Sequence, residues 1–103
     1  MSGLVTLEGL GKADLEGLIE AGSRMADRLA SERRHHSELN GKVVTTAFFE
    51  ASTRTRLSFE QAARYLSADV MTFVPEISSQ VKGESLKDTV LTLAEIGTDV
   101  FVI

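Results

Sequence analysis

The sequence predicts an α/β fold in which helices cover both faces of a parallel sheet, giving three α/β/α layers. Amphipathic segments of helical period alternate with short runs of β-branched and aromatic residues, in the order helix, strand, helix, strand, helix, strand. Hydrophobic residues make up 43% and charged residues 25% of the chain, which is ordinary for a soluble protein. The 103 residues are expected to form one domain, or part of one, over 1–103.

The first helix is expected over 13–39, where apolar residues recur at spacings of three and four. Glu20 and Arg24 add an ion pair at i,i+4, and Asn40-Gly41 ends the polar run that follows. The apolar stripe contains Leu15, Leu18, Ile19, Met25, Ala26 and Leu29.

Strands are expected over 42–49 (KVVTTAFF), over 68–74 (ADVMTFV) and in the final TDVFVI. A second helix is expected from about Thr53, with Glu60 and Arg64 on its outer face. Its inner face would contain Phe59, Ala62, Ala63 and Leu66.

A third helix is expected to begin at a capping box formed by Ser85 and Asp88 and to end at Gly97. Its apolar residues are Leu86, Val90, Leu93 and Ala94. Because the final strand is followed by no helix or polar terminus, we expect the chain to be a truncated domain.

Composition excludes several kinds of function. The net charge of −4 provides no basic field for nucleic acid or an anionic membrane. The chain has no cysteine, which rules out disulfides, thiolate catalysis and cysteine-bound metals. No apolar run approaches the roughly 18 residues of a membrane span, and the N-terminus does not have the pattern of a secretory signal. A cytoplasmic location is expected.

The segment STRTR at 52–56 is the strongest chemical signal in the sequence. It follows a strand and opens a helix, and ligands of open α/β sheets gather at such junctions. A helix N-terminus has unpaired N–H groups and partial positive charge, to which Ser52, Thr53 and Thr55 add hydroxyls and Arg54 adds a bidentate donor. The segment therefore predicts an anion site. The alternative is a simple helix cap, which Ser52 alone would more often be.

The sequence resembles the carbamoyl-phosphate half of aspartate carbamoyltransferases in two linked motifs, FFEASTRTRLSFE at 48–60 and SSQVKGESLKDT at 78–89. The wider transcarbamoylase superfamily shares the STRTR motif. Lys82 before Gly83-Glu84 is similar to the aspartate branch, whereas ornithine-type enzymes usually lack a lysine there.

The resemblance implies that Ser52, Thr53, Arg54 and Thr55 bind the phosphate of carbamoyl phosphate. Thr55 would also polarise the carbonyl oxygen, and Arg54 would stabilise charge on the departing phosphate. Ser78 and Lys82 would lie on a loop that reaches the active site of a neighbouring subunit in a homotrimer. The implied catalytic residues are Arg54, Thr55 and Lys82.

The chemistry implied by this family requires neither metal nor cofactor. Glu50 would pair with arginines outside this chain during domain closure, and Arg56 is expected to be structural. His35 and His36 lie on the polar end of the first helix with no carboxylate at ligand spacing, so no metal is expected there.

The parent enzyme would transfer the carbamoyl group to the α-amine of L-aspartate in pyrimidine biosynthesis. The resemblance covers about residues 40–103, and the family's aspartate-binding groups are missing, so the chain alone is expected to be inactive. Two alternatives remain open. One is a non-catalytic module that binds phosphorylated small molecules or other subunits, and the other is a different transcarbamoylase such as the ornithine type.

Overall fold

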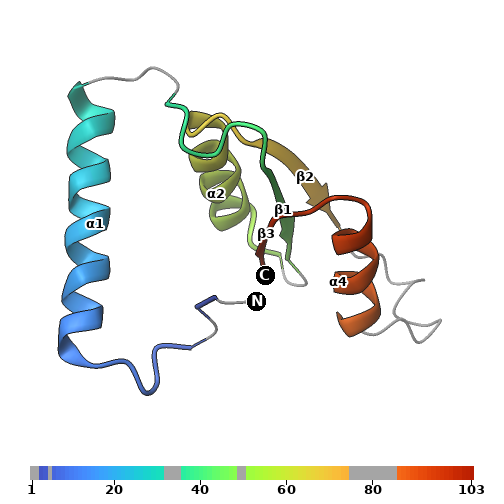
Figure 1. The fold of residues 1–103 in the computed structure, drawn as a ribbon, viewed down its shortest axis with the longest axis horizontal. Coiled ribbons are helices and arrows are strands. Elements are labelled where there is room, and N and C mark those ends of the chain that lie inside the picture. The colour runs from blue at the N-terminus through green and yellow to red at the C-terminus, as the bar shows by residue number, and fades with distance from the viewer. Residues whose placement is uncertain (1–2, 5, 32–35, 49–50, 75–85) are drawn as a thin grey trace. The chain divides into compact units, whose positions relative to one another are not determined.

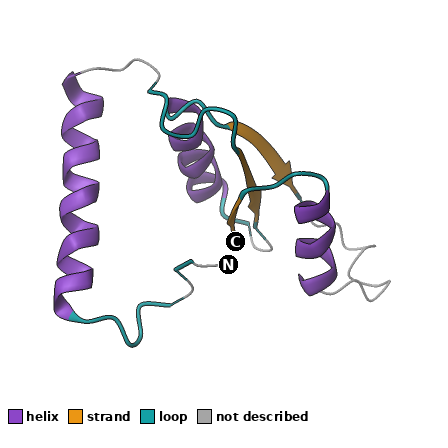
Figure 2. Ribbon diagram, viewed as in Figure 1, coloured by secondary structure: helices purple, strands orange, loops and turns teal. Residues whose placement is uncertain are grey.

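The computed structural model describes residues 3–4, 6–31, 36–48, 51–74 and 86–103. Contacts divide the chain into two units, Met1–Arg34 and His35–Ile103, and each is described by itself. The described helices and strands are drawn in Figures 1 and 2.

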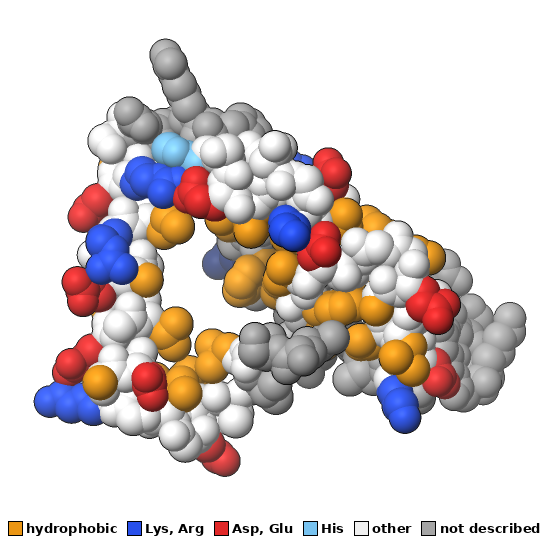
Figure 3. Space-filling view, viewed as in Figure 1, with side chains coloured by type: hydrophobic (Ala, Val, Ile, Leu, Met, Phe, Trp, Pro, Cys, Tyr) orange, Lys and Arg blue, Asp and Glu red, His pale blue; other side chains and the backbone are white. Residues whose placement is uncertain are grey.

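The first unit contains one long helix, α1 (Lys12–Ser31). The Gly11 N–H donates to the Asp14 carboxylate at 3.3 Å, which satisfies an amide just ahead of the first turn. The predicted pair of Glu20 and Arg24 is present at 3.0 Å. No residue of α1 is buried, and Leu18, Ile19 and Met25 of the apolar stripe are exposed; Figure 3 shows hydrophobic side chains along α1.

The prediction that the first helix extends to residue 39 is wrong, because α1 ends at Ser31. His36 and Leu39, which the prediction placed in this helix, form backbone hydrogen bonds within the second unit. The His36 N–H donates to the Tyr65 carbonyl and the Leu39 N–H to the Leu66 carbonyl, at 2.6 and 2.9 Å. These amides cannot also donate along a helix, and a turn through Gly41, with φ of 80°, leads into the sheet.

The second unit is built on a parallel sheet with strand order β2-β1-β3. The strands are β1 (Val43–Ala47), β2 (Asp69–Phe73) and β3 (Val100–Val102), each within the range predicted for it. β1 lies in the centre, where its residues 44–47 are buried. The carboxyl ends of β1 and β2 lie level, since Ala47 pairs with Phe73.

The helices described between these strands are α2 (Thr53–Tyr65) and α4 (Leu86–Glu95). From β1 the chain crosses to β2 on one side and then returns past β1 to β3 on the other. Right-handed crossovers in opposite directions require helices on opposite faces of the sheet, and Figure 1 shows α2 and α4 on opposite sides. The predicted α/β architecture is confirmed.

The predicted inner face of α2 is confirmed at Ala63, which is buried, but not at Ala62 or Phe59, which are exposed. Glu60, expected outside, is 3% exposed, whereas Phe59, expected inside, is 47% exposed. The buried positions of α2 are Glu60 and Ala63, and Ala63 packs in the core with Val44 and Ala68. Phe59 instead contacts Phe48 edge to face, with ring centroids 6.5 Å apart.

The predicted inner face of α4 is partly confirmed. Leu93 is buried, but Ala94 is exposed and Thr89 takes a buried position. Ser85 of the predicted capping box lies outside the described residues. Gly97 ends the helix as predicted, with φ of 114° and its N–H donating to the Ala94 carbonyl at 3.1 Å.

We predict that Gly97→Ala lowers the free energy of unfolding by about 1 kcal/mol, because a Cβ is strained at this positive φ. Gly22→Ala is the matched control, since Gly22 lies within α1 with nothing within 4 Å of an added Cβ. It should raise helix stability by about 1 kcal/mol. Urea unfolding followed by circular dichroism measures both changes. The same change in the free energy of unfolding in both variants would contradict the prediction.

Candidate anion site at the start of helix α2

The STRTR segment lies at the point where the strand order reverses. β1 has β2 on one side and β3 on the other, and the chain leaves β1 at its carboxyl end and enters α2 at Thr53. Ligands of doubly wound sheets bind outside the carboxyl ends of the strands at such a switch point. The fold therefore brings the predicted anion-binding residues to the carboxyl ends of the strands, where an anion site is expected.

Ser52 is the N-cap residue of α2, but its side chain forms no capping hydrogen bond. The first backbone bond of the helix runs from the Arg56 N–H to the Ser52 carbonyl, at 2.9 Å. The amides of residues 53–55 precede that bond and have no acceptor within the helix. No acidic residue lies in the first turn to occupy these donors. The simple-cap alternative for the Ser52 hydroxyl is therefore not what the structure contains.

The side chains of Thr53, Arg54 and Thr55 are exposed, and Ser52 is half-buried. Within the described part of the chain, Arg54 forms no ion pair with an acidic side chain. The Arg54 backbone carbonyl accepts a hydrogen bond from the Ser58 hydroxyl at 2.8 Å. A cation and three hydroxyls thus lie beside unpaired amides, an arrangement that favours an anion.

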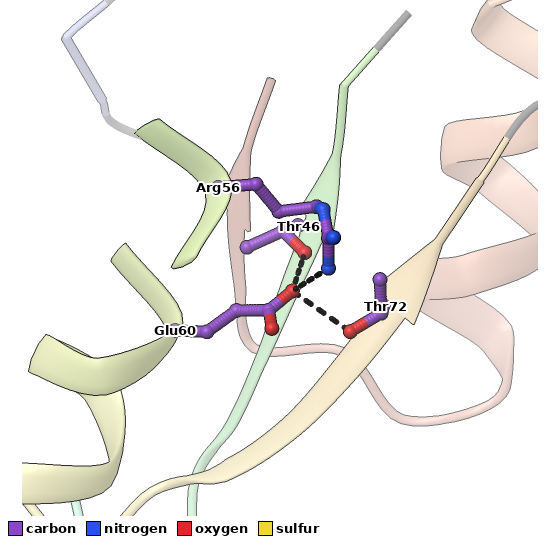
Figure 4. A network of polar contacts seen from close by, with 4 residues as sticks. All are labelled: Thr46, Arg56, Glu60 and Thr72. Carbon is purple, nitrogen blue, oxygen red and sulfur yellow. Dashed lines mark hydrogen bonds and ion pairs between the residues drawn. The ribbon is translucent and has the colours of Figure 1, made fainter. Parts of the chain in front are cut away.

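Arg56, two residues further along α2, has a different environment. Its side chain is 29% exposed, and its Nη1 lies 3.4 Å from Oε2 of the buried Glu60. The same Oε2 accepts hydrogen bonds from the hydroxyls of Thr46 on β1 and Thr72 on β2, at 2.7 and 2.8 Å. Figure 4 shows the three donors converging on this one oxygen. The expectation that Arg56 is structural agrees with this pairing.

The pKa of Glu60 lies below its ordinary value. Burial by itself raises the pKa of a carboxyl group, but the hydrogen bonds from Thr46 and Thr72 and the positive charge of Arg56 outweigh it. Glu60 is therefore ionised in the folded protein at neutral pH. Its charge is balanced by Arg56, whereas Arg54 in the first turn forms no ion pair with an acidic side chain among the described residues.

The sequence contained a signal for this network that the face assignment missed. Two adjacent threonines, Thr45 and Thr46, occupy a strand expected to be buried, and a buried hydroxyl needs a partner. Both are fully buried in the structure. The Thr45 hydroxyl pairs with that of Thr98 at 2.7 Å, and the Thr46 hydroxyl donates to Glu60. Arg56 and Glu60 also have the i,i+4 spacing of an ion pair.

Ser78, Lys82 and Glu50 lie outside the described residues, as does His35. His36 is described, and its Nε2 is buried without a hydrogen-bond partner. In the described part of the chain, no group of three or more histidines and acidic residues has a metal-binding arrangement. No described helix is both long enough and apolar enough to cross a membrane.

Comparison with known proteins connects the site to a family. Residues 3–103 match the family described as aspartate/ornithine carbamoyltransferase, carbamoyl-P binding domain. The aspartate carbamoyltransferase catalytic subunit of Leifsonia xyli subsp. xyli is 48% identical over 103 residues, and that of Thermus thermophilus is 45% identical over 103 residues. The alignments cover all of this chain but 33% and 34% of those proteins, so the chain spans about a third of their length.

A solved structure gives the same result at the level of fold. Aspartate transcarbamoylase from Trypanosoma cruzi, crystallised in complex with carbamoyl phosphate, superimposes with a TM-score of 0.76 and 37% sequence identity. The match covers 91% of this chain and 29% of that protein. The identity extends over most of the chain, so the likeness includes the sequence as well as the fold.

We predict that the lowered pKa of Glu60 makes stability depend on pH. A carboxylate whose pKa is lower in the folded state stabilises the protein fully above its unfolded pKa, ordinarily about 4.5, and this contribution is lost as pH falls through the folded pKa. The free energy of unfolding should therefore decrease below about pH 5 in the wild type. Glu60→Gln should remove this part of the slope, whereas the exposed Glu20→Gln should retain it. Urea unfolding from pH 3 to 7 tests this, and an unchanged slope in Glu60→Gln would contradict it.

Proposed function

Because the chain belongs to the carbamoyl-phosphate-binding domain family of aspartate and ornithine carbamoyltransferases, we propose that Ser52, Thr53, Arg54 and Thr55 bind the phosphate of carbamoyl phosphate. The observation that carries the proposal is the first turn of α2 at the switch point of the sheet, where Thr53 and Thr55 are exposed and Arg54 has no acidic ion-pair partner among the residues that the structure describes. Charge-assisted hydrogen bonds from Arg54 and from backbone amides suit a phosphate group.

In the parent enzyme the α-amine of L-aspartate attacks the carbonyl carbon of carbamoyl phosphate. A C–N bond forms, the resulting tetrahedral intermediate breaks its C–O bond to phosphate, and the amine loses a proton. The products are N-carbamoyl-L-aspartate and phosphate, in pyrimidine biosynthesis. Thr55 polarises the carbonyl oxygen and Arg54 stabilises negative charge on the departing phosphate. The protein contributes orientation and anion stabilisation and forms no covalent bond to substrate.

The amino-acid acceptor is L-aspartate in this proposal. The two relatives reported above carry the name aspartate carbamoyltransferase, and Lys82 has the position that distinguishes the aspartate branch in the sequence motif. The ornithine type is the second candidate, because the matched family includes both. Activity of the full-length parent with each amino acid distinguishes them.

The parent enzyme is proposed to be a cytoplasmic homotrimer in which Ser78 and Lys82 complete the site of a neighbouring subunit. The resemblance of 78–89 to the family's second motif supports this assembly. Residues 1–103 then form the first part of the carbamoyl-phosphate domain, and the aspartate-binding domain belongs to the remainder of the parent.

We predict that phosphate binds the 103-residue chain weakly, with a Kd on the order of millimolar, about −4 kcal/mol. The half-site is open to water, and binding must offset the lost freedom of the ligand. Arg54→Ala should abolish binding, because one charged contact is a large share of so small a total. Arg64→Ala is the matched control, since Arg64 is an exposed arginine in the last turn of the same helix.

The measurement is a phosphate titration followed by amide NMR shifts at constant ionic strength. Shifts should cluster at residues 52–55 in the wild type and in Arg64→Ala. Equal binding by Arg54→Ala, or shifts elsewhere only, would show that the segment is not an anion site. Lys82→Ala should change binding only when chains associate.

A second prediction concerns turnover. Formation of carbamoyl aspartate by the purified 103-residue chain should be undetectable, because the aspartate-binding groups of the family are not among its residues. A radiolabelled carbamoyl phosphate assay measures it. Turnover that persists through further purification and disappears in Arg54→Ala would overturn this expectation.

A further inference from the structure

We propose that Glu60 is a positioning residue for the phosphate site. It holds the first turn of α2 against the carboxyl ends of β1 and β2. This inference rests on the proposed function of Ser52–Thr55. Glu60 itself lies two turns into the helix and is buried, so it contacts no ligand. Its role is exerted through Arg56 and the two threonines that it binds.

Arg56 connects Glu60 to the proposed phosphate site, through its side chain on one side and its backbone N–H on the other. The Arg56 side chain is held by Glu60, while the Arg56 backbone N–H donates to the Ser52 carbonyl at 2.9 Å. Arg56 is thus fixed at both ends, and the residues between it and Ser52 are the proposed phosphate ligands. Substitution of Glu60 removes the partner of the Arg56 side chain, so the position of the first turn of α2 is no longer fixed.

The same carboxylate fixes α2 to two strands. Thr46 and Thr72 are paired in register on β1 and β2, each one residue before the end of its strand. Both donate to the same Oε2. Because a buried carboxylate keeps its partners only in a narrow range of positions, α2 can neither rotate nor slide without breaking several charge-assisted bonds.

This role can be separated from a simple effect of charge. Glu60→Gln removes a negative charge and leaves Arg56 as an unpaired cation near the phosphate. Coulomb attraction alone would then strengthen phosphate binding. A positioning role requires the opposite, because the donors of residues 52–55 lose their fixed arrangement. The sign of the change therefore distinguishes the two.

The experiment measures the Kd of inorganic phosphate by amide NMR titration of the full chain, with urea unfolding measured in parallel. Glu60→Gln should bind about tenfold more weakly than wild type, the scale of one lost charge-assisted hydrogen bond. The matched control is Glu20→Gln, which breaks an exposed i,i+4 pair with Arg24 and should leave the Kd unchanged. The Kd of the folded population is the readout, so a variant that is only less stable keeps the wild-type value.

A second pair of variants serves if Glu60→Gln does not fold. Thr72→Val removes one donor to Glu60 without changing any charge, and Thr72→Ser keeps the hydroxyl. Thr72→Val should weaken phosphate binding severalfold, and Thr72→Ser should restore it.

Equal or tighter binding by Glu60→Gln, or by Thr72→Val where Glu60→Gln is unfolded, would overturn the positioning role while the site itself stands. Absence of phosphate binding in the wild type would overturn the proposed function and this inference together.

Discussion

A single buried carboxylate oxygen joins β1, β2 and α2, the three elements beside the proposed phosphate site of the second unit. Oε2 of Glu60 accepts from Thr46 on β1, Thr72 on β2 and Arg56 on α2. A carboxylate in a protein interior is tolerated only when it is paired and hydrogen-bonded, so the three partners are a condition for the fold and not an addition to it. The apolar core beside them is small, with Val44, Ala63 and Ala68 as its buried members. The polar network accordingly fixes the rotation of α2, which so small an apolar cluster would specify poorly.

The network also separates the two arginines of the STRTR motif. Residues two positions apart on a helix point in nearly opposite directions, about 200° apart. Arg56 faces the sheet and is neutralised by Glu60, which leaves Arg54 on the exposed side of the first turn with Thr53 and Thr55. Cations in the first turn of a helix oppose its dipole. Arg56 is neutralised by Glu60. Arg54 has no acidic partner among the described residues, and its charge can neutralise a bound anion.

Much of this architecture could be predicted from the sequence, and the failures have a common cause. Periodicity and β-branched runs predict the element order and a range that contains each strand, and the junction after β1 indicates the candidate site. Phe59 and Glu60 were assigned to the wrong faces, because hydrophobicity ranks phenylalanine as the residue to bury. Whether a glutamate is buried instead depends on Thr46 and Thr72, which lie 14 and 12 residues away in the chain. The end of α1 was missed for the same reason, since His36 is bonded to the carbonyl of Tyr65. The sequence around Glu60 shows Arg56 at i,i+4 spacing, but the partners on other elements are identified only once the fold brings them together.

The central position of β1 has a consequence for the order in which the unit is assembled during synthesis. β1 emerges from the ribosome first but needs a neighbour on each side. Its pairing with β2 spans 26 positions, as in Val43 with Asp69 (69 minus 43), whereas pairing with β3 spans 56, as in Val44 with Val100 (100 minus 44). Closing the longer loop costs more entropy and has to await later residues. The β1-α2-β2 unit, with the Glu60 network inside it, can therefore form before β3 exists, and one edge of β1 stays open to other strands until β3 is made.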